Sequence, residues 1–463
     1  MNEIELRLAS LRELMKREHL SAFIFPSTDA HQSEYVADHW RGREWISGFN
    51  GSAGTAVVTM KSAALWTDSR YFLAAEKQLE GTEYQLMKLK IEGTPTIAEW
   101  LEKELQEVQS PEVGLDGMVN SYNYVKDLIY SLRKLGGITL RTNLDPLAQI
   151  WENRPSLPAN PVEIQPLEYA GETLASKVAR IRKSLRELHA DGMLVSALDD
   201  IAWTLNLRGT DVHCNPVFVS YLLIESDKVS LFVDDNKLSS EVKQYLQDNQ
   251  VSLYNYNKVE KCLESYSEYN ILLDGDETSY YLWKAVKCQE IVAAGSPIPA
   301  MKAVKNKAEI EGYRSAMLKD GVAMVKFLKW LKPAVEAGGQ TEISIDKKLT
   351  SLRAEQKLFR DISFDTIAGY AQHGAIVHYE ATPETDVVLK PEGLILIDSG
   401  AQYQDGTTDI TRTIALGPVS EEMKHIYTLV LKAHIQLELV KFPDGASGTQ
   451  LDAPSGNLTN SNR

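Results

Sequence analysis

The stretch LILIDSGAQYQDGTTDITRTI, residues 394–414, decides the fold of the last third of this chain. Apolar and β-branched residues run up to Asp398 and resume after Asp409, with an Asp-Gly pair between them. An Asp-Gly pair flanked by strand-forming residues is a strong signal for a two-residue turn, so the stretch predicts a β-hairpin. A carboxylate at the end of an apolar strand is costly to bury without a cation or hydrogen bonds. We therefore expect the chemistry of the chain in this hairpin.

The two aspartates of the hairpin offer paired carboxylates, which are the ligands that hard divalent cations prefer. A simple Asp-Gly turn places Asp398 and Asp409 on one face but four residues out of step, about 13 Å along the strand. Their convergence needs a shift of register, and Gly400 is the expected site of a bulge that would provide it. Taken alone, the pair is better explained by salt bridges to Arg412 or by capping of turns.

Upstream of the hairpin, the sequence repeats one α/β pattern. An amphipathic helix pattern over residues 4–15 leads into the apolar run 22–26, and the same stripe over residues 174–188 leads into the apolar run 193–195. Each copy continues with further strand and helix patterns. Two related domains account for this repeat better than one large domain, given usual domain sizes.

Proline-rich segments mark the seams between these units. Residues 153–161 and 295–299 contain prolines, which hold a chain extended because they lack a backbone donor. We expect a first domain over residues 1–155, a second over residues 160–300 and a third, of different pattern, over residues 305–453.

Composition narrows the class of protein. The chain has 463 residues, of which 43% are hydrophobic, and a net charge of −15 without a basic stripe, so we expect no nucleic-acid partner. No run approaches the roughly 20 apolar residues of a membrane span, and the start lacks the features of a signal peptide, so we expect a cytoplasmic protein that does not contact membranes. The three cysteines are widely spaced, and we expect them to be reduced.

Several motifs, taken together, are specific to one family. The hairpin sequence resembles the two-aspartate metal motif of the Xaa-Pro aminopeptidases, which belong to the creatinase, prolidase and methionine aminopeptidase superfamily. Other matching segments are residues 29–35, 47–56, 200–203, 206–212, 215–218, 363–367 and 374–379. The resemblance covers nearly everything up to Ala453.

The resemblance implies an α/β and α+β architecture, with two related creatinase-like N-terminal α/β domains followed by a pita-bread metallopeptidase domain. It implies release of the N-terminal residue from peptides with proline second, by a hydroxide activated between two metal ions, with manganese expected and zinc or cobalt as alternatives. Asp398 and Asp409 would bind the metals, and Arg412 would orient Asp409. His378 would be catalytic and contact substrate, and His373 is a second candidate substrate contact. The family also suggests a homodimer formed through the N-terminal domains.

The end of the sequence departs from the family pattern. The further histidine and glutamate ligands that the family places after the hairpin are not found, and residues 454–463 form a polar tail without family likeness. We therefore expect a C-terminally truncated member with a partial pita-bread domain, in which under-coordinated metals give little or no hydrolysis. The alternative is a non-catalytic peptide-binding or scaffold protein that keeps the peptidase fold.

Overall fold

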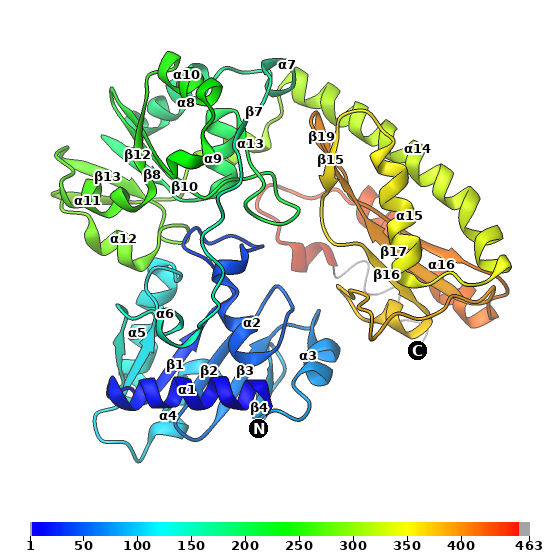
Figure 1. Cartoon of the computed structure of the whole chain (residues 1–463), viewed down its shortest axis with the longest axis horizontal. Helices are drawn as coiled ribbons and strands as arrows, with labels where there is room; N and C mark the ends of the chain where they lie inside the picture. The colour runs from blue at the N-terminus through cyan, green and yellow to red at the C-terminus, as the bar shows by residue number, and fades with distance from the viewer. Residues whose placement is uncertain (1, 453–463) are drawn as a thin grey trace.

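A computed structural model describes residues 2–452 of the chain and shows three units (Figure 1). The first unit, blue to cyan in Figure 1, lies beneath the green second unit, and the third unit, yellow to red, lies beside them. The polar tail expected over residues 454–463 lies outside the described residues.

The first unit is a mixed six-stranded sheet in the order β4-β3-β2-β1-β5-β6. Its strands are β1 (Ala22–Phe25), β2 (Thr55–Thr59), β3 (Ala63–Thr67), β4 (Tyr84–Lys88), β5 (Glu112–Leu115) and β6 (Thr139–Arg141). Its helices are α1 (Glu3–Arg17), α2 (Gly42–Ser47), α3 (Phe72–Gln78), α4 (Ile97–Leu105), α5 (Tyr122–Gly136) and α6 (Leu147–Ile150). The predicted amphipathic helix is α1, which buries Leu8, Leu11 and Met15.

The second unit repeats this topology, as the repeated pattern predicts. Its sheet has the order β12-β11-β10-β8-β13-β14, and each neighbouring pair is parallel or antiparallel as in the first sheet. Its strands are β8 (Gly192–Val195), β10 (Ser220–Glu225), β11 (Val229–Val233), β12 (Val251–Asn255), β13 (Asn270–Leu273) and β14 (Glu290–Ala293). Its helices are α8 (Leu174–Glu187), α9 (Leu198–Leu205), α10 (Ser240–Asp248), α11 (Val259–Glu264) and α12 (Tyr280–Ala285).

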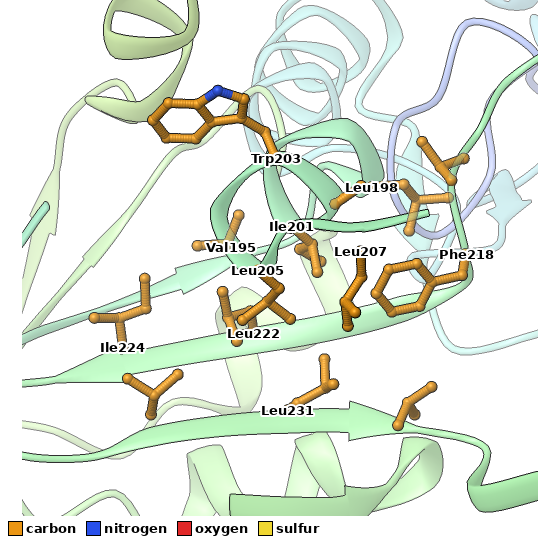
Figure 2. Close-up of a cluster of buried hydrophobic side chains, with 14 of the residues drawn as sticks. Val195, Leu198, Ile201, Trp203, Leu205, Leu207, Phe218, Leu222, Ile224 and Leu231 are labelled. Atoms are coloured by element: carbon orange, nitrogen blue, oxygen red, sulfur yellow. The ribbon is translucent and has the colours of Figure 1, made fainter. Parts of the chain in front are cut away.

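One buried cluster of the second unit lies between α8, α9 and α10 and one face of the sheet, and a second cluster packs α11 and α12 on the other face. Figure 2 shows Ile201 and Leu205 of α9 turned toward Leu222 on β10 and Leu231 on β11. Trp40, from the first unit, belongs to the same buried cluster. Because this apolar cluster is shared, the first two units are held together by burial of side chains as well as by the linker.

The connecting segments are short. They include β7 (Glu163–Ile164), α7 (Leu167–Ala170), β9 (Leu207–Arg208) and α13 (Ile298–Ala303), and β7 pairs with β9.

The third unit packs two helices on strands. Its elements are α14 (Lys307–Ala337), α15 (Glu342–Ala354), β15 (Phe359–Ile362), β16 (Ile367–Tyr370), β17 (Leu394–Ser399), β18 (Ala401–Tyr403), β19 (Gly406–Thr407), β20 (Ile410–Ala415) and α16 (Glu421–Leu439). The strands form the ladders β15-β18-β19 and β16-β17-β20. Phe327, Leu331 and Leu349 of the helices are buried against Ile395 and Ile397 of β17. Helix α16 contributes no buried side chain, and its apolar Ile426, Tyr427, Val430, Leu431 and Ile435 are exposed.

Candidate functional site: a cavity with paired aspartates

The hairpin that carries the two aspartates turns one residue earlier than the sequence predicts. Tyr403 pairs with Gly406, so the two-residue loop is Gln404 and Asp405, and Gly406 already belongs to β19. The Asp405 carboxylate accepts two hydrogen bonds from the Lys319 ammonium group on α14, at 2.6 and 2.8 Å. This ion pair with the long helix places the turn, which explains why the local Asp-Gly signal is misleading here.

The earlier turn brings the aspartates closer than expected. Asp398 lies opposite Thr411 on β20, so it is two residues out of step with Asp409 instead of four. Diagonal neighbours of this kind on one face of a ladder are within side-chain reach. The ladders β17–β20 and β18–β19 keep one register, and no bulge is needed. Gly400 matters for another reason, since an added Cβ there would overlap the carbonyl oxygen of Thr408 and the hydroxyl of Ser363.

The carboxylates of Asp398 and Asp409 meet. Partial burial, the negative charge of Asp398 and a hydrogen bond shared with Asp398 raise the pKa of Asp409 above its usual value. The hydroxyl of Thr411 donates to Asp398 Oδ1 at 2.7 Å and orients that carboxylate. Arg412, which was expected to orient Asp409, instead donates to the carbonyl oxygen of Thr411 at 2.7 Å. Thr411 is therefore a site residue that sequence reasoning missed.

The two histidines lie on the loop that follows β16. The carboxylate of Glu342, fully buried at the start of α15, accepts from Nδ1 of His373 at 3.0 Å, from the hydroxyl of Tyr379 at 2.8 Å and from the backbone N–H of Tyr370 at 2.8 Å. This one buried carboxylate ties down the loop. His378 has a φ of 57°, which is uncommon for a residue other than glycine and persists only when the surroundings enforce it.

The first unit also reaches the site. The hydroxyl of Tyr71 lies 2.7 Å from Nδ1 of His378 and 2.6 Å from the hydroxyl of Ser52. Neither Tyr71 nor Glu342 carries a local sequence signal, because each acts through partners that are distant along the chain. Only the tertiary structure identifies them.

These residues share one cavity of about 930 Å³. Asp398, Asp409, His373 and His378 line it from the third unit, Tyr71 from the first and His213 from the second. A cavity of this size, with convergent polar groups at the junction of domains, is typical of a site for a small molecule or peptide.

The chemistry of the donors fits a divalent cation. The two carboxylates lie as diagonal neighbours on one face of the ladder, and the negative charge of Asp398 contributes to the raised pKa of Asp409, so a cation between them would relieve their repulsion. Within residues 2–452, no third His, Cys, Asp or Glu side chain joins Asp398 and Asp409 in a three-ligand group.

Family models match the whole arrangement. The description "Creatinase/Prolidase N-terminal domain" matches residues 7–140 and again residues 153–309, and "Metallopeptidase family M24" matches residues 311–460. The class of protein is thus an M24 metallopeptidase, in which a pita-bread domain follows two creatinase-like domains.

Individual relatives show which family of M24 metallopeptidases the chain belongs to. The chain is 40% identical to a probable Xaa-Pro aminopeptidase P of Botryotinia fuckeliana, over 96% of this chain and 70% of that protein. It is 37% identical to Xaa-Pro aminopeptidase 1 of Dictyostelium discoideum, over 97% of this chain and 73% of that protein. The chain belongs to the Xaa-Pro aminopeptidase P family, whose members are metal-dependent hydrolases. The alternative of a non-catalytic scaffold is not favoured.

A solved structure agrees with this assignment. The X-prolyl aminopeptidase of Caenorhabditis elegans, described as a cytosolic enzyme with a di-nuclear active site, superposes with a TM-score of 0.93 and 33% identity, over 99% of this chain and 77% of that one. The chain spans between 70% and 77% of the length of these three relatives. Among the described residues, no helix has the length and apolar character needed to span a membrane.

Proposed function

We propose that this chain releases the N-terminal residue from peptides that carry proline at the second position. The observation that carries the proposal is the meeting of Asp398 and Asp409 in a cavity that His378 also lines. The similarity to named Xaa-Pro aminopeptidases over nearly the whole chain supports the choice of substrate.

Asp398 and Asp409 are the residues that would hold the metal. Manganese is the ion we propose, since hard oxygen donors suit it, with zinc or cobalt as alternatives. When bound, such ions supply Lewis acidity and make water a nucleophile near neutral pH.

The chain's own groups orient the side chains that face the reactants. The hydroxyl of Thr411 donates to Oδ1 of Asp398 and so orients that carboxylate. Nδ1 of His378 faces Tyr71, so Nε2 is the ring atom available to hydrogen-bond the peptide or the charge that develops on its carbonyl oxygen. His373 has Nδ1 engaged by Glu342, which likewise leaves Nε2 for the substrate.

Metal affinity is the main determinant of how active the chain is. The described residues supply two carboxylates to the site and no third ligand in the same cluster, so we propose weak binding and slow hydrolysis unless metal is in excess.

We further propose that the domains correspond to residues 1–155, 160–300 and 305–453, that the enzyme acts in the cytoplasm and that it forms a homodimer through its N-terminal domains.

The test is hydrolysis of a short Xaa-Pro-Xaa peptide with added Mn²⁺, before and after chelation. Cleavage that requires Mn²⁺ and is lost in Asp398→Ala supports the proposal. Asp361→Ala is the matched control, because Asp361 is exposed on β15 and its carboxylate accepts from the backbone N–H of the next residue, Ile362. Cleavage that survives both chelation and Asp398→Ala would refute the role of the aspartates. A folded preparation that binds the peptide at saturating Mn²⁺ without cleaving it would favour the scaffold alternative.

A further inference from the structure

A second group of ligand-type side chains lies beside the same cavity, and two of its members, His213 and Asp365, line that cavity. Nε2 of His213 is 2.8 Å from Oδ1 of Asp365, and ligand atoms of His213, Cys214 and Asp365 all lie within 4.8 Å of one another. His213 and Cys214 come from the second unit and Asp365 from the third. Within residues 2–452, this is the one group of three or more His, Cys, Asp or Glu side chains close enough to share an ion.

The turn that presents His213 and Cys214 is rigidly held. Val212 and Asn215 form a β-bridge across it, and Cys214 has a φ of 60°, in the left-handed region that non-glycine residues seldom occupy. The buried carboxylate of Asp211, just before the turn, accepts from the ammonium group of Lys237 at 2.6 Å. A turn fixed at its base and bridged across its tip does not have to be ordered when a ligand binds.

Asp365, the member of the group that comes from the third unit, is held in a fixed position relative to the hairpin of Asp398 and Asp409. Asp365 lies two residues before Ile367, which pairs with Asp398. The two units are also joined beside the cluster, because the side-chain amide of Gln402 donates to the carbonyl oxygen of Cys214 at 3.0 Å. The three ligand atoms therefore keep their mutual positions through backbone and side-chain contacts that do not involve an ion.

The donor set has a chemistry different from that of Asp398 and Asp409. One imidazole nitrogen, one thiol sulfur and one carboxylate oxygen form a mixed set of the kind that binds Zn²⁺ and related transition metals in tetrahedral geometry. The side chains of His213 and Asp365 are about half exposed, at 53% and 50%, whereas Cys214 is buried at 7%. An ion would thus have its sulfur ligand on the protein side and a free position toward the cavity.

We propose that His213, Cys214 and Asp365 form a binding site for Zn²⁺ or an ion of similar softness, bridging the second and third units at the wall of the active-site cavity. Binding of the ion displaces the thiol proton of Cys214, which passes to solvent, and the ion is bound by the thiolate. The site is independent of the proposed peptidase chemistry, since it needs neither Asp398 nor Asp409. An ion there would tie the two units together beside the path to the aspartates.

The test uses Co²⁺ as a coloured substitute for Zn²⁺, in the full chain that carries Asp398→Asn and Asp409→Asn. These two changes remove the carboxylate site, so the readout does not depend on hydrolysis. We expect one Co²⁺ per chain, an absorption band from thiolate-to-cobalt charge transfer, and displacement of the ion by Zn²⁺.

Substitutions then identify the side chains that give rise to the absorption band. Cys214→Ser abolishes it, whereas Cys262→Ser, the matched cysteine control, retains it. His213→Gln and Asp365→Asn change side chains that are about half exposed, and each weakens Co²⁺ binding by at least about tenfold. A band that persists in Cys214→Ser, or affinity unchanged in both His213→Gln and Asp365→Asn, overturns the proposal. Absence of any thiolate band in the starting protein does so too.

Discussion

Replacement of Gly400 by alanine tests how the aspartate hairpin is built. Gly400 lies where β17 passes into β18, and a Cβ at this position would overlap the carbonyl oxygen of Thr408 and the hydroxyl of Ser363. The first of these atoms belongs to the backbone, and the second ends a short serine side chain that is itself hydrogen-bonded to that same carbonyl oxygen. The alanine fits only if the backbone strands move apart.

The free energy of unfolding decreases because such a movement breaks hydrogen bonds between these strands. Ser363 Oγ donates to the carbonyl oxygen of Thr408 at 2.8 Å, Ser363 N donates to the carbonyl oxygen of Gly400 at 3.2 Å, and Ala401 N donates to the hydroxyl of Thr408 at 2.9 Å. At about 0.5–1.5 kcal/mol each, their loss destabilises the hairpin by about 3 kcal/mol, of the same order as a typical overpacking penalty. The separation of Asp398 and Asp409 changes with the strands, so Mn²⁺ affinity falls as well.

Hydrogen–deuterium exchange over residues 394–415 measures the local effect, and urea unfolding measures the global one. Gly321→Ala is the matched control, because Gly321 lies inside α14 and an added Cβ there meets nothing within 4 Å. That change should stabilise the helix by about 0.5–1 kcal/mol. Unchanged exchange in Gly400→Ala, or equal destabilisation by both substitutions, would refute the reasoning.

Three further outcomes are expected. Arg353→Met should destabilise the third unit by about 3–5 kcal/mol in denaturant unfolding, because it leaves Asp320, 2.6 Å from Arg353 Nε, as an unpaired charge in the core. Burial lowers the pKa of His31 below its ordinary 6.5, so the unfolded state takes up a proton first as pH falls through 6.5. Native stability then decreases toward pH 5 by up to about 1.4 kcal/mol per pH unit, and melting of His31→Gln should show a flatter profile. Tyr71→Phe removes the hydroxyl beside His378, and kcat/KM for an Xaa-Pro peptide should fall about fivefold, the equivalent of one hydrogen bond, with exposed Tyr130→Phe as the control.

Local periodicity predicts much of the fold. The apolar spacing of Leu8, Leu11 and Met15 identifies α1 because a helix buries one stripe, and the recurrence of that pattern at Leu174 and Val178 identifies the second copy. The two sheets then show the same strand order. These features depend on neighbours within one or two turns of chain, which a sequence displays directly.

The aspartate hairpin is a feature whose turn and register local sequence signals do not predict correctly. The Asp-Gly signal locates a turn but misplaces it by one residue, because the ion pair of Asp405 with Lys319 outweighs the preference of Gly406 for a turn. In a ladder, one residue of error in the turn changes the relative position of facing residues by two. The Asp-Gly signal therefore predicts a larger separation of Asp398 and Asp409 along the ladder than the structure has.

By itself, the sequence determined the architecture, the family likeness and the pair of aspartates on one hairpin, because helix and strand periods and motif spacing are properties of neighbouring residues. Only the tertiary structure decided that Thr411 orients Asp398 and that Tyr71 of the first unit reaches His378. It also brought His213 and Cys214 to Asp365. Contacts between residues far apart in the chain depend on how whole units pack, since burial and charge pairing are settled among surfaces that no local pattern specifies.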